Sequence, residues 1–196
     1  MPEVCRVHST NRRRNYKLLP PMGKEQITRK SLNPHYVVGF IDGEGSFSVS
    51  INHHKTLKSR VEIKPEFEIE LRADDREILE RIAITIGSGI IYDCSYERYG
   101  WYPHSKYKIS STKEMAAKLF PFLDRYRLQA KKRKCYVVFK KIVGMMLRKQ
   151  HLTAKGLEKI RALREQIRKL GKKPNGQKAR ETARIRENRS SGGVKQ

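Results

Sequence analysis

The amino-acid sequence predicts an α+β protein in which one helix, two strands, a second helix and two more strands are followed by closing helices. Apolar residues change from the helical spacing of three or four positions to strict alternation where this order requires it. Turn and cap residues separate the segments at the same points. A chain of 196 residues, of which 37% are apolar, is also long enough to bury one core.

The first predicted helix begins at Asn33-Pro34 and stops at Gly45. Asn33 can accept a hydrogen bond from a free amide of the first turn, and proline suits the first helical position. Gly39 and Gly43 lie four residues apart on one face, where a second helix could approach closely. The residues that follow alternate as in a strand with one buried face, with Phe47, Val49 and Ile51 on the apolar side and Ser46, Ser48 and Ser50 on the polar side.

Two carboxylates, Asp42 and Glu44, stand among glycines where this helix meets the strand. Mg²⁺ takes one or two protein carboxylates and completes its shell with water and phosphate oxygens, so a carboxylate fixed at this junction suits it. Acidic residues and glycines are also the common residues of turns, so the pair alone does not establish a metal site.

A second strand is predicted from Val61 to Leu71, with an interruption at Pro65. Its polar face carries three glutamates and an arginine, namely Glu66, Glu68, Glu70 and Arg72. Asp74-Asp75 can then cap a helix that ends at Gly87.

Two more strands are expected at residues 89–92 and 106–110. The loop between them, residues 96–102, is rich in tyrosine and contains Trp101. Such a loop either stacks on nucleic acid or packs on itself, and the sequence leaves both interpretations open.

The rest of the chain is predicted to be largely helical. A capping box at Ser111 opens a helix that Pro121 ends or bends. A helix over residues 130–147 begins with the basic run 131–134, and four cations in a first turn oppose the helix dipole. Residues 153–170 form an amphipathic helix that is expected to pack on the core.

The charge balance points to a polyanionic partner. There are 44 Lys and Arg against 20 Asp and Glu, a net charge of +24 and a pI near 10.2, and nucleic acid is the first candidate. No apolar run approaches the ~18 residues of a membrane span, and three scattered cysteines indicate neither a disulfide framework nor a zinc site. We therefore expect a soluble intracellular protein, in a bacterial cytoplasm or an organelle, with no membrane association.

The run V-V-G-F-I-D-G-E-G at residues 37–45, followed by Ser46-Phe47, resembles the signature of the LAGLIDADG homing endonucleases. The likeness continues at residues 67–79, 87–89 and 128–132 and thus extends over the segment 31–150. It implies an αββαββα core whose four-stranded antiparallel sheet forms a saddle over the DNA major groove, with one additional C-terminal helix.

The resemblance also implies roles for single residues. Glu44 matches the acidic residue that holds the catalytic metal, Mg²⁺ or Mn²⁺, and Asp42 matches a more structural position. Lys131 or Lys132 matches a lysine that reaches toward the active site, and the match does not choose between them. Residues expected to face DNA lie on the first two strands and are Ser46, Ser48, Ser50, Asn52, Glu68, Glu70 and Arg72.

The 196 residues contain one copy of the signature, so two metal centres require a symmetric homodimer. Its predicted interface comprises Val38, Gly39, Asp42 and Gly43. The leading hypothesis is an intron-encoded endonuclease that cuts both strands of a long, nearly palindromic DNA site. One alternative is a non-cleaving RNA-binding protein, either an intron maturase or a ribosome-associated protein. The basic excess and the acidic second strand support this RNA-binding alternative. Another alternative is a DNA-binding regulator.

The expected domain organisation has four parts. Residues 1–30 are predicted to be a flexible basic arm, 31–150 the endonuclease domain, 151–171 an accessory helix, and 172–196 a basic disordered tail able to hold phosphates.

Overall fold

The computed structural model describes residues 30–56, 60–96 and 100–171. The predicted basic arm, apart from its last residue, and the predicted tail lie outside the described residues. Four strands form one antiparallel sheet in the order β1-β2-β4-β3. The bounds of these strands are β1 Ser46–His53, β2 Val61–Arg72, β3 Ile90–Cys94 and β4 His104–Ile109. The predicted α+β fold with a four-stranded antiparallel sheet is confirmed.

The helices also follow the predicted order. Short turns of 3-10 helix at Ala73–Asp75 and Gln150–Leu152 precede α2 and α6. The α-helices are α1 Pro34–Glu44, α2 Arg76–Ile86, α3 Thr112–Glu114, α4 Phe120–Arg125, α5 Lys132–Leu147 and α6 Ala154–Gly171.

The proline expected to interrupt β2 is accommodated instead, and the proline expected to end or bend a helix lies within a helical segment that continues past it. β2 runs without interruption through Pro65, because β4 pairs with β2 only from Phe67 onward and Pro65 has a single neighbouring strand, β1. Pro121 follows a π-helical turn, Met115–Leu119, and lies in the first turn of α4. The wider turn leaves room for the proline ring, so the helical segment continues to Arg125.

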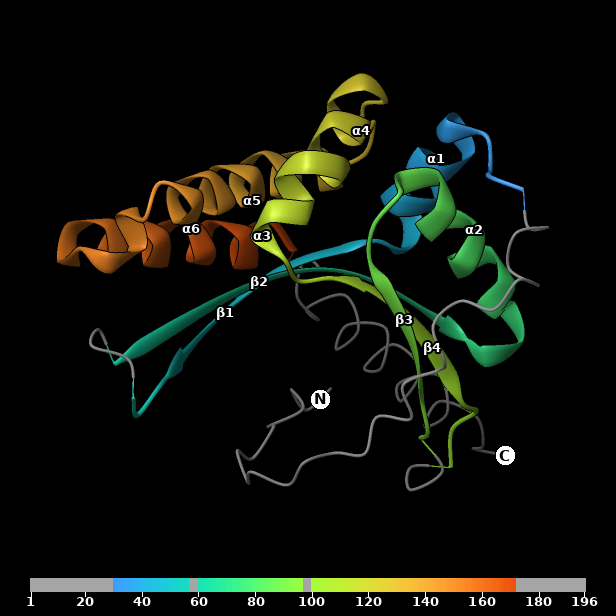
Figure 1. Ribbon diagram of the computed structural model, residues 1–196, viewed down its shortest axis with the longest axis horizontal. Helices are drawn as coiled ribbons and strands as arrows, with labels where there is room; N and C mark the ends of the chain where they lie inside the picture. Colours follow the sequence, from blue (N-terminus) through green and yellow to red (C-terminus); the bar gives the residue numbers. More distant parts are fainter. Residues whose placement is uncertain (1–29, 57–59, 97–99, 172–196) are drawn as a thin grey trace, which may run out of the picture. The chain divides into compact units, whose positions relative to one another are not determined.

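The core lies between the sheet and the helices. Figure 1 shows α1 to α6 on one side of the curved sheet, and no described helix covers the other side. Phe47 of β1 packs against Phe67, Tyr136 and Phe139, with ring centroids 5.1 to 5.6 Å apart. α6 joins this core through Ile160 and Ile167, which are 0% and 7% exposed. The opposite face of the sheet is therefore left as a polar surface.

Candidate active site

The end of α1 places Glu44 at the start of the sheet. Asn33 caps the helix, accepting from the His35 amide at 2.9 Å, and the Gly45 amide closes it on the Ile41 carbonyl at 2.9 Å. A Cβ at Gly45 would lie 2.8 Å from two atoms of Ile41, so only glycine fits this tight passage into β1. Glu44 is the last residue of α1 and is exposed to solvent.

Lys132, at the start of α5, reaches the end of α1 that carries this carboxylate. Its Nζ donates a hydrogen bond to the Gly43 carbonyl at 2.9 Å. Burial lowers the pKa of the Lys132 ammonium, while the charges of Glu44 and Asp42 act in the opposite direction. The side chain of Lys131 is exposed. Of the two candidate lysines, the structure brings Lys132 to the end of α1.

Asp42 connects α1 to the loop before α5. Its Oδ2 accepts from the backbone amides of Gln129 at 2.7 Å and Ala130 at 3.2 Å. Its Oδ1 is buried and makes no hydrogen bond with any described residue. Asp42 therefore fixes the chain two residues before Lys132. The sequence gives no direct signal for this link, which joins residues 87 and 88 positions apart.

One stripe of α1 is open. Gly39 and Gly43 are exposed, and a Cβ built on either would meet no described atom within 4 Å. Tyr36, one turn earlier, is 48% exposed. Val38 is only 5% exposed and belongs to the core of its own chain, so its side chain does not lie on this stripe. The side chain of Asp42 also points elsewhere, because it binds the loop before α5. Of the four predicted interface residues, Gly39 and Gly43 are the two that are exposed on this stripe.

The predicted DNA-facing residues share the uncovered face of the sheet. Ser46 and Ser48 are exposed while Phe47 and Val49 are buried, which gives β1 the expected alternation. The register pairs the polar residues of β1 with those of β2: Ser46 with Glu68, Ser48 with Glu66, Ser50 with Lys64 and Asn52 with Glu62. Glu70 and Arg72 continue the same face of β2.

Three of the four glutamates of β2 are neutralised by lysines of β4. Lys106 forms ion pairs with Glu68 at 3.3 Å and Glu70 at 2.8 Å, and Lys108 pairs with Glu66 at 2.6 Å. Reasoning from the sequence missed both lysines, although their alternation with buried Tyr107 places them on the polar face. The acidity of β2, which had supported an RNA-binding alternative, is therefore offset by residues of the neighbouring strand.

The aromatic loop packs partly on itself. Tyr96 lies 6.0 Å from Trp101 and 5.1 Å from His104, centroid to centroid, and its hydroxyl donates to Glu70 at 2.8 Å. Tyr102 is 68% exposed and lies under the Arg72 guanidinium, 4.4 Å from the ring centroid.

Within the described segments, no group of three or more His, Cys, Asp and Glu residues could hold a metal ion. Glu44 offers a solvent-accessible carboxylate, whose hard oxygens match Mg²⁺, but one carboxylate leaves most of the coordination to water, phosphate or a second chain. The described part of the chain also contains no helix long and apolar enough to span a bilayer.

The sequence matches the model of the LAGLIDADG endonuclease family over residues 37–143. Among curated proteins, a probable intron-encoded endonuclease 2 of Neurospora crassa is 27% identical over 135 residues, which cover 66% of this chain and 28% of that protein. The chain thus spans less than a third of the length of this relative.

Two solved structures resemble the fold. I-SmaMI, bound to an uncleaved DNA target in the presence of calcium ions, is 34% identical with a TM-score of 0.66, covering 71% of this chain and 46% of I-SmaMI. The homing endonuclease I-TnaI is 28% identical with a TM-score of 0.62, covering 71% of this chain and 96% of I-TnaI.

Proposed function

This chain belongs to the LAGLIDADG endonuclease family, and on that premise we propose that it is a homing endonuclease that hydrolyses both strands of a long DNA site. The observation that carries the proposal is the exposed carboxylate of Glu44 at the end of α1, where the Lys132 ammonium binds the preceding Gly43 carbonyl and the polar face of the sheet begins. A phosphodiester held against that face would lie close to an acidic group and a cation together.

The sheet face suits the major groove. Four strands spaced about 4.8 Å apart measure about 14 Å between the outer two, close to the groove width of roughly 12 Å. Ser48, Ser50 and Asn52 would read base edges from β1, while Glu68 and Lys106 offer an acceptor and a donor side by side. I-SmaMI, which matches this fold, binds DNA.

Glu44 is the residue proposed to hold Mg²⁺ or Mn²⁺. A metal ion bound there would polarise the scissile phosphate and lower the pKa of a water molecule. Lys132 adds positive charge where negative charge develops, and the Gly43 carbonyl orients its ammonium. Asp42 holds the loop that delivers this lysine.

We propose that two copies form a symmetric dimer through the open stripe of α1. Gly39 and Gly43 place no side chain on this stripe, and a Cβ built on either meets no described atom within 4 Å, so a second helix could approach closely. The dimer would bring two Glu44 carboxylates together, one for each DNA strand, and would favour a nearly palindromic target. The chain covers 46% of I-SmaMI but 96% of I-TnaI, as expected if I-SmaMI carries two such units in one chain.

The test is cleavage of a duplex that joins the sequences flanking the intron or reading frame that encodes this chain. The wild type and Glu44→Gln are compared with Mg²⁺, with Mn²⁺ and with EDTA. A double-strand cut that requires both the metal and Glu44 is the expected result. A folded wild-type dimer that leaves this duplex intact and instead binds the intron RNA tightly would replace the proposal with a maturase function.

The name of the Neurospora relative, an intron-encoded endonuclease, supports the same gene setting for this chain. We accordingly propose that the protein acts in a bacterial cytoplasm or an organelle, where it would meet the intron-free copy of its host gene. Localisation of the tagged chain together with that gene is the corresponding measurement.

A further inference from the structure

The uncovered sheet face is close to neutral, so it offers little net charge to DNA phosphates. Along β2 and β4 it carries four glutamates, at positions 62, 66, 68 and 70, and four Lys and Arg residues, at 64, 72, 106 and 108. Five of these eight side chains are joined in the ion pairs of Lys106 and Lys108. Contacts between cationic side chains and phosphates supply much of the affinity for DNA. Because the sheet face is close to neutral, these cations must come from outside it.

The geometry of the groove indicates where the phosphates would lie. Because the sheet is about as wide as the major groove, its strands must run along the groove, with the two DNA backbones beside the edge strands. The edge strands of this sheet are β1 and β3. A cationic group beside β1 is therefore in reach of one backbone.

α6 lies against β1 and is strongly basic. It contains six Lys and Arg residues against two glutamates. Ile160 and Ile167 anchor it in the core, and the Nε of Arg164 donates to the Val49 carbonyl of β1 at 2.9 Å. The flank of α6 that carries Arg164 thus faces the edge of the sheet.

Arg161 and Arg168 share that flank, because positions three before and four after Arg164 lie on the same side of a helix. Arg161 is exposed, and no described residue forms an ion pair with it. Among the described residues, Arg168 forms an ion pair only with Glu165 of its own helix, at 3.1 Å, and both side chains are about half exposed. Such a surface pair contributes little and can be exchanged for a phosphate.

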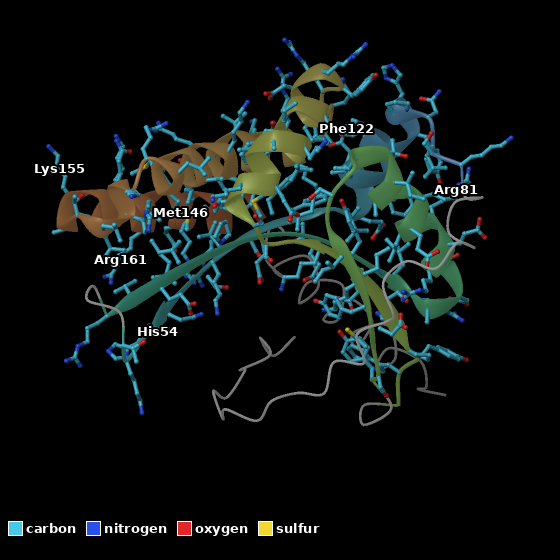
Figure 2. The ribbon with its side chains drawn as sticks, viewed as in Figure 1. His54, Arg81, Phe122, Met146, Lys155 and Arg161 are labelled. Carbon is cyan, nitrogen blue, oxygen red and sulfur yellow. The ribbon has the colours of Figure 1, made fainter. Side chains whose placement is uncertain are left out.

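We infer that Arg161 and Arg168 form a phosphate clamp beside β1, which grips the DNA backbone outside the base-reading face. In Figure 2 Arg161 extends from α6 on the side where β1 and β2 run, whereas Lys155 projects from the opposite side of the same helix. The clamp rests on the proposed DNA-binding function and adds to it the residues that supply affinity without sequence preference. Arg164 is the positioning residue that fixes this flank against the strand.

The test compares two double variants of the full chain, Arg161→Gln with Arg168→Gln and, as the matched control, Lys155→Gln with Lys159→Gln. Each removes two positive charges from exposed positions of α6. Binding to a 40-base-pair duplex of the intron-free junction and to a duplex of random sequence is titrated at several salt concentrations. Thermal unfolding of each variant verifies that the fold is intact.

Each lost phosphate contact should make the negative slope of log K against log salt shallower by about 0.9. For the arginine variant the slope should therefore be shallower by roughly 1.8 per chain, on both duplexes. Neutral methylphosphonates at the flanking phosphates should weaken binding of the wild type but not of that variant. Equal slopes for the two double variants, with a wild type that still cuts, would overturn the clamp alone. A wild type that binds neither duplex would instead overturn the proposed function, and the clamp with it.

Discussion

The ammonium of Lys132 donates a hydrogen bond to the backbone carbonyl of Gly43 at 2.9 Å, so the cation lies next to the residue that precedes Glu44. The two partners come from helices that are far apart in the sequence. This contact distinguishes Lys132 from its neighbour Lys131, although the two look equivalent in the basic run 131–134. Lys132 is partly buried beside the carboxylates, whereas Lys131 is exposed.

The first prediction concerns this difference between the lysines. Lys132→Met should lower kcat by about 10²–10³, because it removes a positive charge aimed at the developing charge of the transition state. Lys131→Met should change kcat by less than about threefold. The two variants should weaken DNA binding to a similar degree, since each loses one cation from the same turn. Single-turnover cleavage of the junction duplex measures the two rates. Equal rates for the two variants would contradict the assignment of Lys132.

The pKa of Lys132 provides a second prediction. Burial lowers it below the ordinary value of 10.5, so the ammonium loses its proton as the pH rises through the lowered value, and cleavage should fall before pH 10.5 is reached. In that window the unfolded chain binds more protons than the folded chain, so this group alone makes stability rise with pH. Glu44 opposes the lowering, and Glu44→Gln should therefore lower the Lys132 pKa further.

NMR titration of the lysine side chains measures this pKa without any need for activity. Lys132→Met identifies the resonance, and Asp74→Asn serves as a control that removes an exposed carboxylate paired with Arg72 instead. An unchanged or raised Lys132 pKa in Glu44→Gln would show that the two groups do not interact.

A third prediction concerns stability in acid. Burial raises the pKa of Glu70, but hydrogen bonds from Lys106, Tyr96 and His104 outweigh burial and lower it below 4.5. This carboxylate thus contributes stability above pH 4.5 that is lost as the pH falls through its lowered pKa. Lys106→Met should flatten the loss of stability in that range, as followed by urea unfolding between pH 3 and 6. A profile parallel to that of the wild type would show that Lys106 does not control this carboxylate.

Much of the fold could be predicted from the sequence because its signals are local. The alternation in residues 46–51 and the Asn33-Pro34 start define β1 and α1 without any tertiary contact. Pro65 was misjudged because its tolerance depends on where β4 begins to pair, and the helix of Pro121 continues past it after a π-helical turn. The pairing of β4 is not encoded near Pro65 itself.

The candidate site was predictable only in part, for the same reason. The signature points to Glu44, and the glycine spacing points to the open stripe of α1. The amides that bind Asp42 and the lysines that neutralise β2 come from other elements, so only the folded chain brings them together. Val38 was predicted to lie in the interface with its neighbour Gly39, but the structure buries it in the core of its own chain. Adjacent residues of one helix point in different directions, so one can face the core and the next the solvent.

The open stripe of α1 gives a fourth prediction. A Cβ at Gly39 meets no described atom within 4 Å, so Gly39→Leu should leave the monomer folded while its side chain blocks approach of a second helix. Sedimentation should then report a monomer, and circular dichroism should report unchanged helix content. Ala162→Leu, which enlarges an exposed residue of α6, is the matched control and should remain dimeric. A stable dimer of Gly39→Leu would place the interface elsewhere.

Asp42 gives the last prediction, because its carboxylate supports Lys132 through the loop before α5. Asp42→Asn removes the charge that accepts from the Gln129 and Ala130 amides and should cost about 1–3 kcal/mol of unfolding free energy. It should also lower kcat with little change in DNA affinity, since the loop no longer fixes the lysine. If Asp42 acts through Lys132, the same substitution in a Lys132→Met background should lower kcat no further, because coupled residues are not additive. Full additivity of the two losses in kcat would show that Asp42 affects cleavage by a route that does not involve Lys132.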